Sequence, residues 1–173
     1  ITYGDIAASE HQGKFENLAL SRFEALDCHI GVDPEQRYSE PQQFREPYAA
    51  DSADDSSRRS HVVLAWLLGD STDLAATMRA RLLSSVLFDN SASPLQKLLE
   101  TTDLGLSPSP MCGLEDSQRE ICFACGIEGA DDATAEQSAE ALEQQVLATL
   151  TDVANNGLPF SQVAASLHQL ELQ

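Results

Sequence analysis

The sequence predicts an α+β fold in which helices pack on one face of an antiparallel sheet. The run from His61 to Leu68 is mostly apolar and has the length of a strand, while segments with helical spacing follow it and close the chain. The resulting order is strand, helix, helix, strand, strand, helix, helix. With 173 residues and 42% hydrophobic content, the chain is long enough to bury one sizeable core.

The first 60 residues divide into a strand end, a helix and an extended connection. Residues 2–6 are typical of a strand end followed by a turn, and helical spacing predicts a helix over residues 8–27. The residues that approximate one face of this helix are Phe15, Leu18, Ala19, Arg22, Phe23 and Leu26. Residues 31–60 contain three prolines and few aliphatic side chains, which predicts an extended linker or a strand-like strap.

An acidic cluster, Asp51, Asp54 and Asp55, lies within this connection. A calcium loop needs ordered oxygen ligands and a glycine at fixed spacing, and the cluster has neither. We therefore interpret it as a solvated loop.

The strand predicted over His61–Leu68 is apolar on both faces, which favours a central position in the sheet. Ser71 or Thr72 is expected to cap the helix that follows, and Asp73 lies where the helix dipole favours an anion. That helix is expected to run to about Phe88. Its predicted inward stripe comprises Leu74, Met78, Leu82, Leu83, Val86 and Leu87.

Ser93 and Pro94 predict the start of a second, shorter helix, and Gln96 completes the pattern of a capping box. Leu95, Leu98 and Leu99 form its inward face. Two strands are then predicted, at about residues 111–114 and 119–127.

Thr134 and Gln137 offer another capping box, which predicts a helix that runs to Asn155. Its predicted inward residues are Ala139, Leu142, Val146, Leu150 and Val153. Asn156 and Gly157 predict a left-handed stop, after which residues 158–161 start the last helix. Its predicted inward residues are Val163, Leu167 and Leu170.

The charge balance argues against two classes of partner. The chain has 28 acidic and 10 basic residues and a formal net charge of -18, so it is expected to repel nucleic acid and anionic membrane surfaces. No apolar run approaches the roughly 20 residues that a membrane-spanning helix needs, and the N-terminus lacks the pattern of a signal peptide. Both ends fall inside predicted elements, so we expect the chain to be part of a longer protein.

Four cysteines are too few for a disulfide framework in a chain of this size. Cys28 stands alone, while Cys112, Cys122 and Cys125 fall on the two predicted strands. If residues 121–127 form a strand, the odd spacing of Cys122 and Cys125 places their sulfurs on opposite faces. We interpret the cysteines as ordinary buried thiols in a reducing compartment. A redox or metal site that uses Cys122, Cys125 and His168 is the alternative.

Five short sequence motifs resemble those of a known family. In order they are TYGDI at 2–6, AWLLGD at 65–70, SPLQKLLE at 93–100, GIEG at 126–129 and LHQLEL at 167–172. Together they resemble the insulinase (pitrilysin-type) zinc metallopeptidases, in the presequence-protease-like branch. Gln96 departs from this pattern, because relatives often have an aromatic residue after Ser-Pro-Leu.

The resemblance implies a domain organisation. Residues 1–29 correspond to the end of the preceding domain, residues 30–60 to a linker, and residues 61–173 to an incomplete non-catalytic α+β domain. The implied function is that of an inactive domain in a zinc endopeptidase, where it forms part of a peptide-degrading chamber. The implied partners are the remaining domains and unfolded peptides, and the implied location is the bacterial cytoplasm or the mitochondrial matrix.

The family's zinc site uses the motif H-x-x-E-H and a further Glu downstream. This chain has His168 and Glu171 at the right spacing, but Leu172 stands where the second His is needed. The other histidines, His11, His29 and His61, are scattered, and a G-x-S-x-G motif is absent. We therefore expect no catalytic residue, no metal ligand and no cofactor in this chain, and assign no substrate-binding residue. The parent's zinc would be bound by another domain.

A stand-alone protein-interaction module with a peptidase-like fold and no metal is the alternative function. We also expect possible self-association, because an incomplete domain leaves an open sheet edge and an apolar face.

Overall fold

The computed structural model describes residues 3–24, 31–49 and 57–172, and the chain divides into two compact units, residues 1–33 and 34–173. In the first unit, helix α1 (Ala8–Leu18) is followed by the single 3-10 turn η1 (Leu20–Arg22). The helix predicted over residues 8–27 therefore ends early, because Ala19 leaves helical geometry at φ -137°. Residues 25–27 lie outside the described residues.

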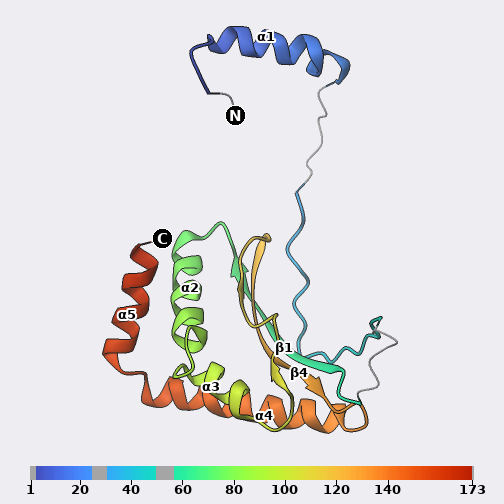
Figure 1. Cartoon of the computed structure of the whole chain (residues 1–173), viewed down its shortest axis with the longest axis vertical. Coiled ribbons are helices and arrows are strands. Elements are labelled where there is room, and N and C mark those ends of the chain that lie inside the picture. The colour runs from blue at the N-terminus through green and yellow to red at the C-terminus, as the bar shows by residue number, and fades with distance from the viewer. Residues whose placement is uncertain (1–2, 25–30, 50–56, 173) are drawn as a thin grey trace. The chain divides into compact units, whose positions relative to one another are not determined.

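The second unit contains an antiparallel sheet (Figure 1). Its strands are β1 (Ser60–Asp70), β2 (Ser107–Pro108), β3 (Gly113–Glu115) and β4 (Glu120–Ala130). Strand β4 pairs with β1 on one side and with both β2 and β3 on the other. The predicted α+β class is confirmed.

The prediction that β1 is a central strand is wrong within the described part of the chain. Strand β1 lies at the edge of the sheet and has β4 as its one described neighbour. The apolar side chains of β1 differ in their burial. Val62, Leu64 and Trp66 pack against the core, whereas Leu67 and Leu68 are 38% and 47% exposed.

The two later strands differ from their predicted bounds. The strand predicted over residues 119–127 is confirmed as β4 and continues to Ala130. The strand predicted over residues 111–114 corresponds to β3, which starts two residues later, at Gly113, and ends at Glu115. Strand β2 was not predicted, because Pro108 argues against a strand in sequence. A proline is tolerated there since β2 lies on the far edge of the sheet.

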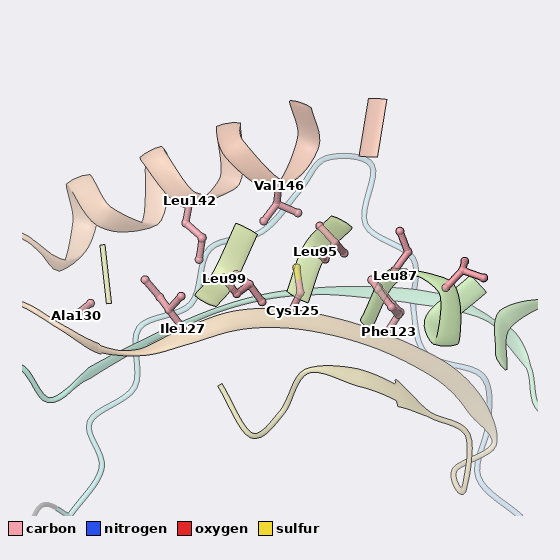
Figure 2. Close-up of a cluster of buried hydrophobic side chains, with 10 residues drawn as sticks. Leu87, Leu95, Leu99, Phe123, Cys125, Ile127, Ala130, Leu142 and Val146 are labelled. Atoms are coloured by element: carbon pink, nitrogen blue, oxygen red, sulfur yellow. The ribbon is translucent and has the colours of Figure 1, made fainter. Parts of the chain in front are cut away.

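The described part of the second unit also contains four helices: α2 (Leu74–Phe88), α3 (Pro94–Thr101), α4 (Ala135–Asn156) and α5 (Phe160–Glu171). Helices α3 and α4 lie over one face of the sheet, and α2 and α5 lie side by side (Figures 1 and 2). Gln162 Nε2 donates a hydrogen bond to the Val86 carbonyl oxygen at 3.3 Å, which joins the start of α5 to the end of α2.

The core lies between β4 and the helix layer (Figure 2). It comprises Val86, Leu87, Leu95, Leu99, Phe123, Cys125, Ile127, Ala130, Leu142 and Val146. Leu95, Ile127, Leu142 and Val146 are each fully buried. Because apolar burial stabilises roughly in proportion to area, this layer contributes most to the stability of the fold.

The inward stripe predicted for α2 is partly wrong. Leu74, Met78 and Leu83 are 73%, 40% and 50% exposed, while the smaller Thr77 and Ala80 are buried. Small side chains on the packed face let the helix approach its neighbours closely. Helical spacing alone does not reveal this preference. In α5, Leu167 is likewise 44% exposed rather than inward.

The predicted helix caps are also corrected. Asp73, rather than Ser71 or Thr72, caps α2, since its carboxylate accepts from the Ala76 amide at 2.9 Å. Neither capping box forms: the side chains of Ser93 and Thr134 make no cap hydrogen bond. Gly157, at φ 72°, ends α4 as predicted.

Candidate functional site

The pair nearest to the family's zinc motif lies on the surface of α5. His168 Nδ1 is 3.6 Å from a Glu171 carboxylate oxygen, and the two side chains are 70% and 65% exposed. Leu172, the next residue, is also exposed. One imidazole and one carboxylate on an open surface do not fit a catalytic zinc ion, which takes three protein ligands. The pair is a surface contact between residues one helical turn apart.

No group of three His, Cys, Asp or Glu side chains that could hold a metal ion occurs among residues 3–24, 31–49 and 57–172. The acidic cluster at Asp51, Asp54 and Asp55 and the isolated Cys28 lie outside these ranges.

The cysteines of β4 point to opposite faces of the sheet, as their spacing predicts. Cys125 is fully buried in the core, whereas Cys122 is half-buried and does not belong to the core cluster. Burial and the nearby Cys112 raise the pKa of the Cys125 thiol to about 12. A thiol of that pKa is protonated at neutral pH, which removes it as a nucleophile or a metal ligand there.

The Cys112 thiol contacts the backbone of β4. The Gly126 amide donates to Cys112 Sγ at 3.2 Å, and the thiol contacts the Gly126 carbonyl oxygen at 3.4 Å. Burial is the first cause of a raised pKa for this thiol, and the hydrogen bonds offset it in part. Both core-side thiols therefore favour the ordinary-thiol interpretation over the redox alternative.

Strand β1 pairs with β4 on one side, and no other described strand pairs with its outward edge. The register of β1 on β4 shifts twice, between Ser60 and Val62 and between Leu67 and Gly69. Such irregularities increase twist and are common at sheet edges. In general, an edge strand presents backbone donors and acceptors to which another strand can be added.

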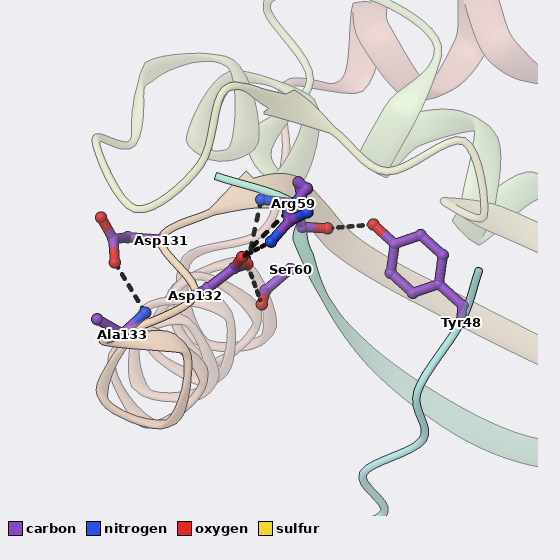
Figure 3. A network of polar contacts seen from close by, with 6 residues as sticks. All are labelled: Tyr48, Arg59, Ser60, Asp131, Asp132 and Ala133. Atoms are coloured by element: carbon purple, nitrogen blue, oxygen red, sulfur yellow. Dashed lines mark hydrogen bonds and ion pairs between the residues drawn. The ribbon is translucent and has the colours of Figure 1, made fainter. Parts of the chain in front are cut away.

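A network of polar contacts fixes the start of β1 (Figure 3). Asp132, in the turn between β4 and α4, accepts hydrogen bonds from Ser60 Oγ at 2.8 Å and from the Arg59 guanidinium at 3.2 and 3.3 Å. The hydrogen bond from Ser60 is the main cause that lowers the pKa of Asp132, and Arg59 contributes further. The carboxylate is therefore held in its charged form.

Residues 34–49, which we call the strap, lead toward the same place without forming a helix or a strand. At the near end, Glu120 accepts from the Arg37 guanidinium at 2.5 Å and from the Glu35 amide at 2.6 Å. At the far end, Arg45 pairs with Glu136 at 2.8 Å, and the Tyr48 hydroxyl donates to the Arg59 carbonyl oxygen (Figure 3).

A surface hollow of about 550 Å³ lies at the far end of the strap. Strap residues 45–48 line one side, and Arg59, Ser60 and Asp132 line the other. The Tyr48 and His61 rings meet edge to face there, with centroids 5.4 Å apart.

The sequence predicts an extended linker or a strand-like strap over residues 31–60, but it does not predict the contacts of the strap. A signal was present, because no Lys or Arg follows Arg119, whereas the residues after it include nine acids. The arginines of the preceding segment had those acids as candidate partners. Which pairs form could not be read from the sequence, because it depends on the path of the strap across the sheet.

Within the described residues, no helix is both long enough and apolar enough to cross a membrane.

Comparison with known proteins identifies the fold's relatives. The family described as the peptidase M16 inactive domain matches residues 3–170. The chain is 31% identical to the mitochondrial presequence protease of Xenopus tropicalis and 30% identical to that of Mus musculus, in each case over 173 residues and 99% of this chain. It is 29% identical over 171 residues to the mitochondrial presequence protease of Gibberella zeae.

The chain spans 16% of the length of each of these relatives. The match to residues 3–170 nevertheless covers nearly all of both units, including the strap. The five short sequence motifs and the α+β architecture agree with this family match. The chain belongs to the peptidase M16 inactive domain family, and its resemblance to the presequence-protease-like branch of the insulinase peptidases is confirmed.

Proposed function

We propose that this domain is an architectural part of a zinc endopeptidase and forms part of the wall of its peptide-degrading chamber. The observation that carries the proposal is the match to an inactive peptidase domain over nearly the whole chain, in relatives about six times longer. In this view residues 1–29 end the preceding domain, residues 30–60 link the two, and residues 61–173 form the inactive domain.

The partners would be the remaining domains of the same polypeptide. Exposed apolar side chains support this: Phe15 and Leu18 in α1 are 52% and 74% exposed, and Leu74 in α2 is 73% exposed. Large exposed apolar residues in several elements are consistent with surfaces that another domain covers.

Zinc would be held by another domain of the parent, since His168 and Glu171 alone do not fit it. This domain would contribute shape and the open β1 edge, along which an unfolded peptide can be held by backbone hydrogen bonds. The names of the relatives call them mitochondrial, and for the parent of this chain we propose the mitochondrial matrix or the bacterial cytoplasm.

Complementation tests the proposal. The parent polypeptide lacking residues 1–173 is expected not to cleave an unstructured fluorogenic peptide, and adding this chain separately is expected to restore chelator-sensitive cleavage. The chain alone is expected to be inactive. Metal-dependent cleavage by the pure chain would contradict the non-catalytic role, and full activity of the parent without this segment would contradict the architectural one.

The stand-alone interaction module makes the opposite prediction for assembly. Such a module would bind its partner without the rest of the peptidase. If the chain fails to associate with the remainder of the parent in a pull-down, that alternative gains support.

A further inference from the structure

We propose that Cys112 and Cys125 are a cross-strand pair of thiols that closes to a disulfide under oxidising conditions and ties the short strands β2 and β3 to β4. The pair differs from the redox site considered above, which would use Cys122, Cys125 and His168. The proposal concerns this domain alone and does not depend on the peptidase assignment.

The strand register sets the two cysteines opposite each other. Leu114 of β3 lies opposite Phe123 of β4. Continuing that register by two residues, one beyond the start of β3, sets Cys112 opposite Cys125. Side chains two positions apart in a strand share a face. Leu114, Phe123 and both cysteines accordingly lie in the core or pack against it.

The contacts of Cys112 place its sulfur beside Cys125. The Gly126 amide donates to Cys112 Sγ at 3.2 Å, and this amide nitrogen is bonded directly to the carbonyl carbon of Cys125. After burial, Cys112 is the second cause of the raised pKa of Cys125, and such an electrostatic effect falls off with distance. The two thiols are therefore close neighbours.

The backbone geometry suits a disulfide. The Gly126 carbonyl oxygen accepts from the Ser109 amide at 2.9 Å, so the backbone of Gly126 points toward β2 and β3. Backbone groups alternate along a strand, so those of Cys125 point toward β1. Cys125 therefore presents a non-hydrogen-bonded position to Cys112, at which the Cα atoms of facing residues lie about 4.5 Å apart. A disulfide needs Cα atoms roughly 4.4–6.8 Å apart.

The exchange begins at Cys112, because this thiol is half-buried and Cys125 is fully buried. The oxidant is a low-molecular-weight disulfide such as glutathione disulfide. The Cys112 thiol loses its proton and attacks one sulfur of the oxidant, which releases one glutathione. The Cys125 thiol then loses its proton and attacks Cys112 Sγ, which releases the second glutathione. The protein loses two hydrogen atoms, and the oxidant is reduced to two thiols.

The reduced pair is the resting state. Burial is the first cause of the raised pKa of each of the two thiols, so little thiolate forms at neutral pH and the exchange is slow. A reducing compartment also keeps such a pair as thiols. The disulfide therefore forms only when an oxidant accumulates.

The disulfide would strengthen a weakly paired side of the sheet. Strands β2 and β3 have two and three residues, and β4 is the described strand with which each of them pairs. Residues 109–112 connect them in a turn, in which the Cys112 amide donates to the Ser109 carbonyl oxygen at 3.1 Å. A covalent bond from this turn to β4 restrains the unfolded chain as well as the folded edge.

Two variants with equal numbers of thiols test the pair. Cys28→Ser/Cys122→Ser keeps Cys112 and Cys125, whereas Cys28→Ser/Cys125→Ala keeps Cys112 and Cys122. Cys122 lies three residues before Cys125 and on the other face of the sheet, so the second variant is the matched control.

Both native chains are incubated with glutathione disulfide, blocked with iodoacetamide and analysed by peptide mass spectrometry. The disulfide between Cys112 and Cys125 is expected to form at least about tenfold faster than one between Cys112 and Cys122, because the fold holds only the first pair together. In urea the two variants are expected to close at similar rates. Equal native rates, or a glutathione adduct on Cys112 that Cys125 does not displace, would overturn the proposal.

The wild-type chain is expected to form the same bond. Trypsin cleaves after Arg119 and separates Cys112 from the later cysteines, and chymotrypsin cleaves after Phe123 and separates Cys122 from Cys125. The linked peptides therefore identify the partner of Cys112. A wild-type link from Cys112 to Cys122 instead would contradict the register argument.

Thermal unfolding tests what the disulfide does. The oxidised Cys28→Ser/Cys122→Ser chain is expected to melt about 5 °C above its reduced form, and dithiothreitol should reverse the shift. The control variant, treated in the same way, should show no such rise. An unchanged or lower Tm of the closed chain would overturn the stabilising role of the bond.

Discussion

The helix layer over β4 and the strap beside β1 are held in opposite ways. Leu142 and Val146 of α4 are fully buried against β4, whereas every residue of the strap is exposed and its anchors are polar. The free energy gained by apolar packing grows with the area removed from water, whereas surface ion pairs contribute little and are screened by salt. The helix layer is therefore fixed by its apolar core, whereas the strap is held by polar contacts at its ends.

The largest expected effect comes from opening the packed side. Leu142→Ala removes a fully buried side chain from the contact between α4 and β4. We expect it to lower the free energy of unfolding by about 2–5 kcal/mol, measured by urea denaturation. Leu147→Ala, on the same helix but 44% exposed, is the control and should cost far less. Similar losses for the two variants would mean that the core does not lie where Figure 2 places it.

Thiol reactivity sharpens the same contrast. The pKa of Cys125 is raised from 9.0 to about 12, so its thiolate fraction at neutral pH is about a thousandfold below that of an ordinary thiol. We expect native Cys125 to react with iodoacetamide at least that much more slowly than in the urea-unfolded chain, as followed by peptide mass spectrometry. Cys122, half-buried on the other face, is the internal comparison. Rapid native labelling of Cys125 would revive the redox interpretation.

The join between the two regions is the β1–β4 pairing, where Gly126 leaves no room for a side chain. A Cβ there would lie 2.2 Å from the Val62 carbonyl oxygen and 2.8 Å from the Val63 Cα, and backbone cannot easily move away. Gly126→Ala is expected to cost about 1–3 kcal/mol in urea denaturation. At Gly69, in the same strand pair, a Cβ meets nothing within 4 Å, so Gly69→Ala should be close to neutral. Equal stability of the two variants would contradict the close approach of the strands.

The sequence predicted the packed side well, because apolar periodicity reports burial directly. Leu95 and Leu99 in α3 and Leu142 and Val146 in α4 are buried as predicted. The predicted inward faces are wrong where small or polar side chains, rather than large apolar ones, are buried. In α2 the buried face uses Thr77 and Ala80, which a hydrophobic pattern does not select.

The sequence assigned no catalytic, metal-binding or substrate-binding residue, so it predicted no site beyond the places of single residues. Leu172 excluded the family's zinc motif from α5, and the spacing of Cys122 and Cys125 placed them on opposite faces. The anchors of the strap were not predicted, because Arg37 and Glu120 lie 83 residues apart and meet only through the path of the chain across the sheet. The edge position of β1 was missed for a similar reason, since strand order is set by pairing rather than by composition.

The smallest expected effect concerns the polar contacts that fix the start of β1. The pKa of Asp132 is lowered, first by the hydrogen bond from Ser60 and then by Arg59. A carboxyl whose pKa is lower in the folded state stabilises the fold at pH values above its unfolded pKa of 3.8, and this contribution is lost as pH falls through the folded pKa. Asp132→Asn should therefore lower the Tm at pH 7, and its Tm should approach that of wild type below about pH 3.8. Ser60→Ala, which removes the main cause of the shift, should give an intermediate curve. Circular dichroism melts from pH 7 to pH 2.5 measure both, and parallel curves for wild type and Asp132→Asn would show that this carboxylate does not couple to folding.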